Sequence, residues 1–271
     1  MTSAAPRELP IAEHRVRDAL ALAHELADLA DGASLPAFDE AAFDVEAKPD
    51  GTAVTAIDRG VERTLRARIL ERFPDHAVLG EEDGLDGPEG APRWILDPID
   101  GTTNYVKGNP IWATLIALQV DGVEVVGVAS APALGVRFAG ALGQGAWRDG
   151  RPIRVSAVDR LADAEVSFGG LSYFQRDGLT GLVDDLTART ARQRGYGDFW
   201  QHCLVAAGST DVAIEAEVNL WDLAAVRCIV EAAGGRFTCL GGRPTADGGS
   251  AVATNGRLHD AVLDLVAAHR A

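Results

Sequence analysis

Two aspartates, Asp97 and Asp100, stand three residues apart in the stretch Trp94–Tyr105, whose sequence is W-I-L-D-P-I-D-G-T-T-N-Y. The apolar residues before Asp97 predict a short buried strand, and Pro98 restricts the backbone, so we expect the two carboxylates to converge in a tight turn. Converging carboxylates repel each other unless a cation lies between them, and oxygen ligands suit Mg²⁺ or Mn²⁺. The stretch therefore predicts a metal site.

The triplet Gly101, Thr102 and Thr103 follows these aspartates directly. Its backbone N–H groups could open a helix N-terminus that holds a phosphate beside the metal. Taken alone, an Asp-Pro-x-Asp-Gly string also fits an ordinary surface turn, because Asp, Pro and Gly all favour turns. The strand before the string and the threonines after it favour the metal and phosphate interpretation.

Three further acids stand near the end of a predicted strand or the start of a predicted helix: Asp58, Glu81 and Asp222. Such positions gather at one edge of a layered α/β protein, where ligands commonly bind. Divalent cations held there would polarise a phosphoryl group and activate water. The simpler alternatives are helix caps for Asp58 and Asp222 and a plain loop for Glu81.

Apolar spacing predicts the elements that must position these acids. Residues 49–52 predict a turn, and a meander of antiparallel strands is expected in the middle of the chain. The expected strands are residues 77–79, 94–96, 113–120, 123–129, 135–139, 145–147, 165–168, 211–215 and 251–253. The expected helices are residues 11–30, 57–69, 179–189, 199–207, 223–233 and 258–268.

A boundary near residue 155 would divide the chain into two halves. The N-terminal half, residues 1–154, would be an α+β unit that carries the metal-binding stretch. The C-terminal half, residues 155–271, alternates strands and helices, and it would be an α/β unit that completes the active site.

The composition narrows the class of protein. The chain has 271 residues, 47% of them hydrophobic, and a net charge of −15, which argues against a general nucleic-acid or anionic-membrane binder. The three cysteines lack metal-pair spacing and predict reduced core thiols. The first ten residues hold no apolar run of signal-peptide length, and no run approaches the ~20 residues of a membrane span. We therefore expect a soluble, cytoplasmic protein.

Rival chemistries have little support in the sequence. The Gly80-x-x-x-Gly84 spacing lacks the Lys-Ser/Thr of a nucleotide-binding loop, the six histidines show no zinc spacing, and Gly208-Ser209-Thr210 is not a nucleophile elbow. A glycosidase could also use paired carboxylates, but a Gly-Thr-Thr array beside them suits phosphate better than a sugar ring.

Three motifs together resemble the signature motifs of the inositol monophosphatase family. They are G-E-E at Gly80, the D-P-I-D-G-T-T string at Asp97, and W-D-L-A-A at Trp221 with E-A-A-G-G at Glu231. The similarity runs from about residue 48 to the C-terminus. The resemblance implies a layered αβαβα sandwich and a Mg²⁺-dependent, often lithium-sensitive phosphomonoesterase that acts on a small phosphorylated substrate. It also implies a homodimer.

The resemblance also implies a role for each matching residue. Two or three Mg²⁺ ions, or Mn²⁺ as a substitute, would be held by Glu81, Asp97, the carbonyl of Ile99, Asp100 and Asp222. Asp58 and Thr102 would orient and deprotonate the attacking water, with Glu81 close by. Asp100 and Asp222 would also face the substrate, whose phosphate would be held by the N–H groups of Gly101, Thr102 and Thr103.

The string R-G-Y-G-D-F-W at Arg194 is similar to the histidinol-phosphate phosphatase branch of the family. Asp198 and Glu215 would then face the ammonium and imidazole of histidinol, while Arg194 would pair with the phosphate or position Asp198. A structural ion pair between Arg194 and Asp198 is the simpler alternative. An inositol-1-phosphatase, a 3'(2'),5'-bisphosphate nucleotidase and a non-catalytic metal-binding regulatory protein also remain open.

Overall fold

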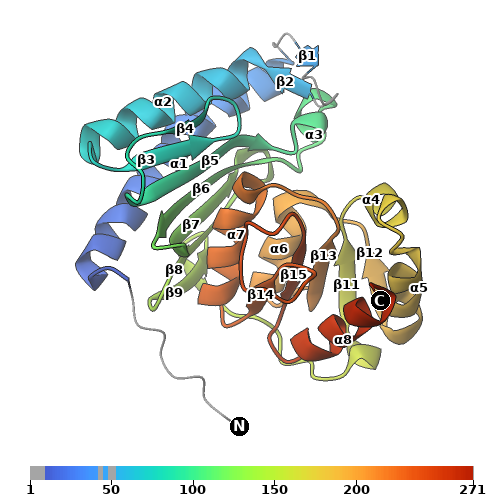
Figure 1. The fold of residues 1–271 in the computed structure, drawn as a ribbon. Helices are drawn as coiled ribbons and strands as arrows, with labels where there is room; N and C mark the ends of the chain where they lie inside the picture. Colours follow the sequence, from blue (N-terminus) through green and yellow to red (C-terminus); the bar gives the residue numbers. More distant parts are fainter. Residues whose placement is uncertain (1–9, 42–44, 48–52, 271) are drawn as a thin grey trace.

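The chain folds into five alternating layers, seen edge-on in Figure 1. The computed structural model describes residues 10–41, 45–47 and 53–270. Two helices, an eight-stranded sheet, two more helices, a five-stranded sheet and a last set of helices follow one another. The expected αβαβα sandwich is therefore confirmed.

The first layer consists of α1 (Glu13–Glu40) and α2 (Ala56–Arg72), which pack on one face of the large sheet. Helix α1 is longer than the predicted segment, which ended at Ala30. Its last turns pack Leu35 and Phe38 against the buried Tyr105 and Trp112, and this long-range contact sustains the helix past Pro36. Spacing within the helix alone does not reveal that contact.

The eight-stranded sheet has the order β10-β9-β8-β7-β6-β5-β3-β4. Its pairs are antiparallel except β3 with β5, so the predicted meander is confirmed. The strands are β3 (Ala77–Gly80), β4 (Gly84–Asp86), β5 (Arg93–Asp100), β6 (Ala113–Val120), β7 (Val123–Ala131), β8 (Val136–Ala141), β9 (Gly145–Arg148) and β10 (Arg151–Ile153).

Strand β5 carries the opening aspartates and corrects the expected tight turn. The strand continues through Pro98 to Asp100, and its pairing with β6 shifts register between Asp97 and Asp100. A bulge tolerates proline because it leaves a ladder position unpaired. Thr114 donates its hydroxyl to the carbonyl of Pro98 at 2.8 Å, and both aspartates are buried. The surface-turn alternative is therefore wrong.

The central layer consists of α6 (Asp198–Ala206) and α7 (Leu220–Ala232), between the two sheets. Helix α7 begins at Leu220 rather than at the predicted residue 223, because Asp222 accepts the backbone N–H of Asn219 at 2.8 Å. The helix lies very close to the large sheet: a Cβ on Gly127 would come within 2.3 Å of the Ala225 carbonyl oxygen. Glycine is required at that crossing.

The five-stranded sheet has the order β12-β11-β13-β15-β14. The last layer of helices packs on its outer face. The strands are β11 (Glu165–Phe168), β12 (Arg192–Arg194), β13 (Val212–Glu215), β14 (Arg236–Thr238) and β15 (Ala251–Thr254). The outer helices are α4 (Leu171–Arg176), α5 (Thr180–Arg189) and α8 (His259–His269).

Small elements complete the fold. These are β1 (Val45–Ala47), β2 (Ala53–Thr55), α3 (Thr102–Val106) and the 3-10 turns η1 (Pro132–Leu134) and η2 (Leu161–Asp163). The predicted turn at 49–52 lies outside the described residues. The sequence did not predict β1, β2, β4, β10, β12, β14 or α4, which are six residues long or shorter.

In the sequence, the last strand of the large sheet ends at Ile153 and the first strand of the small sheet begins at Glu165. The change from one sheet to the other therefore falls near the predicted boundary. The division into units 1–154 and 155–271 stays a prediction. Cys203, Cys228 and Cys239 are buried and free. Among the described residues, no helix combines the length and apolar character needed to span a membrane.

Candidate active site

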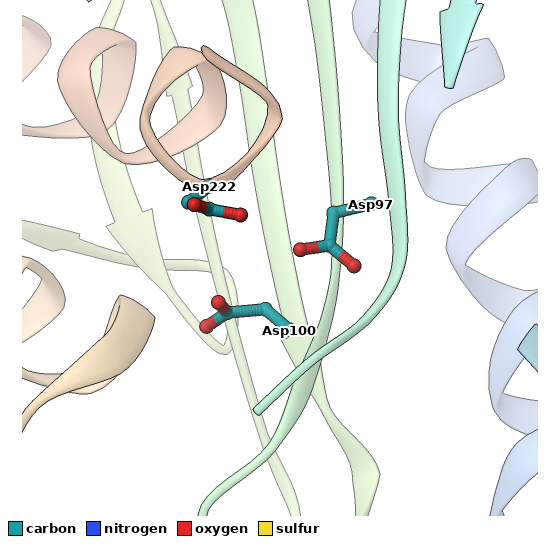
Figure 2. A group of neighbouring side chains, drawn as sticks. All are labelled: Asp97, Asp100 and Asp222. Carbon is teal, nitrogen blue, oxygen red and sulfur yellow. The ribbon is translucent and has the colours of Figure 1, made fainter. Parts of the chain in front are cut away.

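Three carboxylates converge where the large sheet meets the central helices (Figure 2). Asp97 and Asp100 come from the bulge of β5, and Asp222 comes from the first turn of α7. One oxygen of each lies within 4.8 Å of the others. Asp97 and Asp100 are buried, whereas Asp222 is partly exposed. We refer to these three residues as the acidic cluster.

The pKa values of all three carboxyl groups in the acidic cluster are raised, which indicates that the cluster lacks a compensating positive charge. Burial, followed by the charges of Glu81, Asp100 and Asp222, raises the pKa of Asp97 well above its ordinary value. Burial also raises the pKa of Asp100, with Asp198 and Asp222 adding to the effect. Burial is likewise the main cause that raises the pKa of Asp222 to about 7, although the Asn219 N–H opposes it. Buried, mutually repelling carboxylates need protons or a cation, and an all-oxygen set suits a hard divalent ion.

Asp58 joins this region from the first turn of α2. Its Oδ2 accepts the backbone N–H and the hydroxyl of Thr55, at 2.8 and 2.6 Å, and Thr55 Oγ1 accepts the backbone N–H of Asp58 at 3.4 Å, so Thr55 as N-cap and Asp58 form a capping box. Its Oδ1 lies 3.5 Å from the hydroxyl of Thr102, which also donates to the carbonyl of Ile99 at 2.9 Å. The cap alternative for Asp58 is thus confirmed, and the cap leaves Oδ1 directed toward Thr102.

Glu81 follows β3 and lies beside the acidic cluster without belonging to the set of oxygens within 4.8 Å. Burial is the main cause that raises the pKa of Asp58, of Asp97 and of Asp222, and the charge of Glu81 adds to it in all three. The structure therefore brings Glu81 near the residues that the sequence grouped with it.

Gly101 makes the turn from β5 into α3 with a φ of 81°, in the left-handed region that favours glycine. A Cβ there would lie 3.0 Å from the carbonyl oxygen of Ile111. Thr102 and Thr103 are the first residues of α3, whose leading N–H groups have no partner within the helix.

Asp198 and Glu215 form a second acidic region next to the cluster, from the start of α6 and the end of β13. Asn104 donates its amide to Asp198 at 2.9 Å, and the N–H of Phe199 binds Asp100 at 2.8 Å. Burial, followed by the charge of Glu215, raises the pKa of Asp198 to about 6.

Glu215 receives the side-chain amide of Gln201, and His202 Nε2 lies 3.6 Å from its carboxylate. Both ring nitrogens of the buried His202 lack a hydrogen bond among the described contacts. Gly169 leaves the room that this acid occupies, since a Cβ there would lie 2.8 Å from Glu215 Cγ.

Arg194 lies at the exposed edge strand β12, where its guanidinium donates to the carbonyl of Gln193 at 2.6 Å. The described contacts contain no ion pair between Arg194 and Asp198, so the simpler alternative for these two residues finds no support.

Several polar residues around the site escaped the sequence analysis. Asn104, Gln201 and His202 contact Asp198 or Glu215, and Glu62 binds the turn that follows Glu81. Glu62 had a signal, because it follows Asp58 by one helical turn and so shares its face of α2. Gln201 and His202 lie in the predicted helix 199–207, whose apolar neighbours gave the helix prediction, and Asn104 stands in the opening stretch without an assigned role.

The inositol monophosphatase family model matches residues 16–271. The chain belongs to the inositol monophosphatase family. It is 49% identical to a histidinol-phosphatase of Mycobacterium tuberculosis, over 91% of this chain and 96% of that protein. It is 34% identical to a fructose-1,6-bisphosphatase/inositol-1-monophosphatase of Aquifex aeolicus, over 82% of this chain and 84% of that protein.

Solved structures agree with this assignment. An inositol monophosphatase from Anabaena superposes with a TM-score of 0.83 at 30% identity, and 94% of this chain and 97% of the other are covered. The suhB protein of Bartonella henselae gives a TM-score of 0.85 at 27% identity, covering 92% and 98% of the two chains. The family and its named relatives identify this member of the inositol monophosphatase family as a phosphatase.

Proposed function

We propose that the chain is a Mg²⁺-dependent phosphomonoesterase that hydrolyses L-histidinol phosphate to L-histidinol and phosphate. The observation that carries the substrate is the position of the buried Glu215 and the partly buried Asp198 beside the metal-suited cluster. An acidic region next to a phosphate site suits a leaving group that carries an ammonium and an ionisable imidazole. Relatives named histidinol-phosphatase, at 38 to 49% identity, support the same substrate.

The buried carboxylates fit the proposed ions. Asp97, Asp100, Asp222, Glu81 and the carbonyl of Ile99 would hold two or three Mg²⁺ ions, with Mn²⁺ as a possible substitute. When bound, the ions would supply the positive charge that offsets the phosphate and lowers the pKa of water. The raised pKa values of the cluster support this assignment, because a divalent ion relieves the repulsion that causes them.

The remaining residues would orient the reactants. Asp58 Oδ1 and the Thr102 hydroxyl are near each other, so together they would position a water molecule and accept its proton. Because Thr55 saturates Oδ2 of Asp58, Oδ1 is the oxygen left for that role. The N–H groups of Gly101, Thr102 and Thr103 would bind the phosphate oxygens, and Asp100 and Asp222 would face the phosphate as well.

On the leaving-group side, Asp198 and Glu215 would contact the cationic groups of histidinol. Asn104 and Gln201 hold these two carboxylates through uncharged side-chain amides, which preserves their negative charge for the substrate. Arg194 would approach the phosphate from the exposed edge of the small sheet. We also propose a homodimer, as the family resemblance implies, and a cytoplasmic location, which the free, buried cysteines support.

A second candidate substrate is inositol 1-phosphate, favoured by the Aquifex aeolicus relative whose name includes that activity. The test measures phosphate release from histidinol phosphate, inositol 1-phosphate and adenosine 3',5'-bisphosphate with Mg²⁺ and with EDTA. We expect kcat/KM to be largest for histidinol phosphate and activity to vanish with EDTA. A larger kcat/KM for inositol phosphate would overturn the substrate, and the absence of any activity would favour the non-catalytic alternative.

A further inference from the structure

Helix α2 carries a second buried acid one turn after Asp58. Glu62 is fully buried, with 0% exposure, and a buried carboxylate needs hydrogen-bond donors or a charged partner. Its Oε2 accepts the backbone N–H of Glu82 at 2.8 Å, and its Oε1 accepts the N–H of Asp83 at 3.0 Å. These are the two residues that follow Glu81, so Glu62 binds the turn from which Glu81 projects.

Arg66 completes this arrangement from the next turn of α2. Its Nε donates to Glu62 Oε1 at 2.8 Å, and its Nη1 donates to the carbonyl of Val78 at 3.1 Å. Its Nη2 donates to the carbonyl of Gly84. One ion pair therefore contacts β3, the turn and β4 together. We call Glu62 and Arg66 the α2 clamp.

Gly80 shows how closely strand and clamp approach each other. A Cβ at this position would lie 2.1 Å from Glu62 Oε1 and 2.5 Å from Oε2. The carboxylate therefore occupies the space beside the last residue of β3, and glycine is the residue that permits it.

The clamp opposes a force that acts on the turn. The backbone N–H of Glu81 donates to the carbonyl of Leu96 at 3.2 Å, which places Glu81 beside Asp97 and the other acids of the cluster. When no cation offsets them, like charges that lie side by side repel each other. The charge-assisted bonds from the next two N–H groups to Glu62 hold the turn against that repulsion.

We propose that Glu62 is a positioning residue, which holds the turn 81–83 so that Glu81 faces the acidic cluster and thereby sets the affinity of the site for divalent ions. The inference rests on the proposed metal role of Glu81. Helix α2 then has two functions at the site, because it presents Asp58 itself and fixes Glu81 through Glu62.

The test replaces Glu62 with Gln in the full chain. Partners that orient metal ligands typically change metal affinity by about 10- to 100-fold. We expect at least about a tenfold weaker affinity for Mn²⁺, measured by electron paramagnetic resonance on the metal alone, and a matching shift in the MgCl₂ concentration that raises the Tm. At saturating metal, the KM for the phosphate ester should stay within about twofold of the wild type, because the clamp acts through metal occupancy.

Glu71→Gln is the matched control, since it changes the same residue type on the same helix, at an exposed glutamate that pairs with Arg68 and does not contact the turn. It should leave metal binding unchanged. Gly80→Ala is the second variant, because its Cβ must displace the Glu62 carboxylate, and it should weaken metal binding as Glu62→Gln does. If Glu62→Gln fails to fold, the Mn²⁺ affinity of Gly80→Ala tests the role of the clamp instead.

Two outcomes would overturn the inference, and they are distinguishable. If Glu62→Gln or Gly80→Ala lowers the Tm while Mn²⁺ affinity stays within twofold of the wild type, the clamp is only structural. Glu81→Gln tests the premise: unchanged metal affinity in that variant would remove Glu81 from the metal site of the proposed function. Weakened binding in Glu81→Gln together with normal binding in Glu62→Gln would contradict the clamp alone.

Discussion

The two acidic regions of the site have different neighbours. Asp97, Asp100 and Asp222 are surrounded mainly by one another and by Glu81, and all three carboxyl groups have a raised pKa. Asp198 and Glu215 contact the amides of Asn104 and Gln201, and His202 stands 3.6 Å from Glu215. The pKa of Asp198 is also raised, to about 6, but the carboxylates of the second region have side-chain amides as partners, whereas those of the first mainly face other carboxylates.

This difference separates two tasks. A cluster whose repulsion is not relieved by the protein has a strong preference for a divalent ion, which suits catalysis. Carboxylates held by neutral donors stay available to a monocation such as a substrate ammonium. We therefore expect changes in the first region to affect every phosphate ester equally, and changes in the second region to affect one class of leaving group.

The largest expected effect comes from Asp97→Asn, which removes a charge from the centre of the cluster at nearly constant volume. Because a bound metal contributes several kcal/mol to transition-state stabilisation, kcat/KM should fall by roughly 10³-fold or more for all substrates. Phosphate release and circular dichroism would check activity and folding. Asp121→Asn, on an exposed hairpin turn, is the control and should retain wild-type activity. Retention of more than a tenth of the activity by Asp97→Asn would contradict the metal role.

A smaller, selective effect is expected from Glu215→Gln. A hydrogen bond to a charged group contributes about 1.5–3 kcal/mol, so kcat/KM for histidinol phosphate should fall by about 10- to 100-fold. The value for inositol 1-phosphate should stay within about threefold, because its leaving group is uncharged. Glu217→Gln is the control, because Glu217 is two residues away and pairs with Arg176 on the surface. Equal losses for both substrates would show that the two regions do not act separately.

The mildest effect concerns the pH dependence of stability in EDTA. The pKa of Asp222 is about 7 in the folded chain, against an ordinary value of 3.8, so the folded state binds more protons between these limits. The free energy of unfolding should therefore fall as the pH rises from about 4 to 7, and Mg²⁺ should restore it at pH 8. Calorimetry at pH 5 and 8 would measure this, and Asp222→Asn should reduce the difference. A higher Tm at pH 8 than at pH 5 without metal would contradict the sign.

The sequence predicted correctly those strands whose bounds depend on the local alternation of apolar and polar residues. The strand from Ala113 to Val120 has the expected bounds, and so does the one from Glu165 to Phe168. The grouping of Asp97, Asp100 and Asp222 also followed from the sequence, because each acid stands near the end of a predicted strand or the start of a predicted helix and the layers bring such positions together.

The sequence failed where a long-range contact decides the structure. Strand β5 continues through Pro98 because β6 pairs with it at Asp97 and again at Asp100, before and after the bulge. Helix α1 extends past Ala30 because Phe38 packs against Tyr105 and Trp112. The importance of Glu62 was not apparent for the same reason, since its partners Glu82 and Asp83 lie beyond the end of α2. Such pairings follow from tertiary packing rather than from spacing.

The acidic cluster draws Asp97 from the first half of the chain and Asp222 from near its end. During synthesis, the ribosome releases β5 and its bulge long before α7 exists. A growing chain, or one cut short before residue 220, carries the two aspartates of β5 without the third. We therefore expect the proposed metal site to form only after Asp222 has been synthesised, and products that end before it to be inactive.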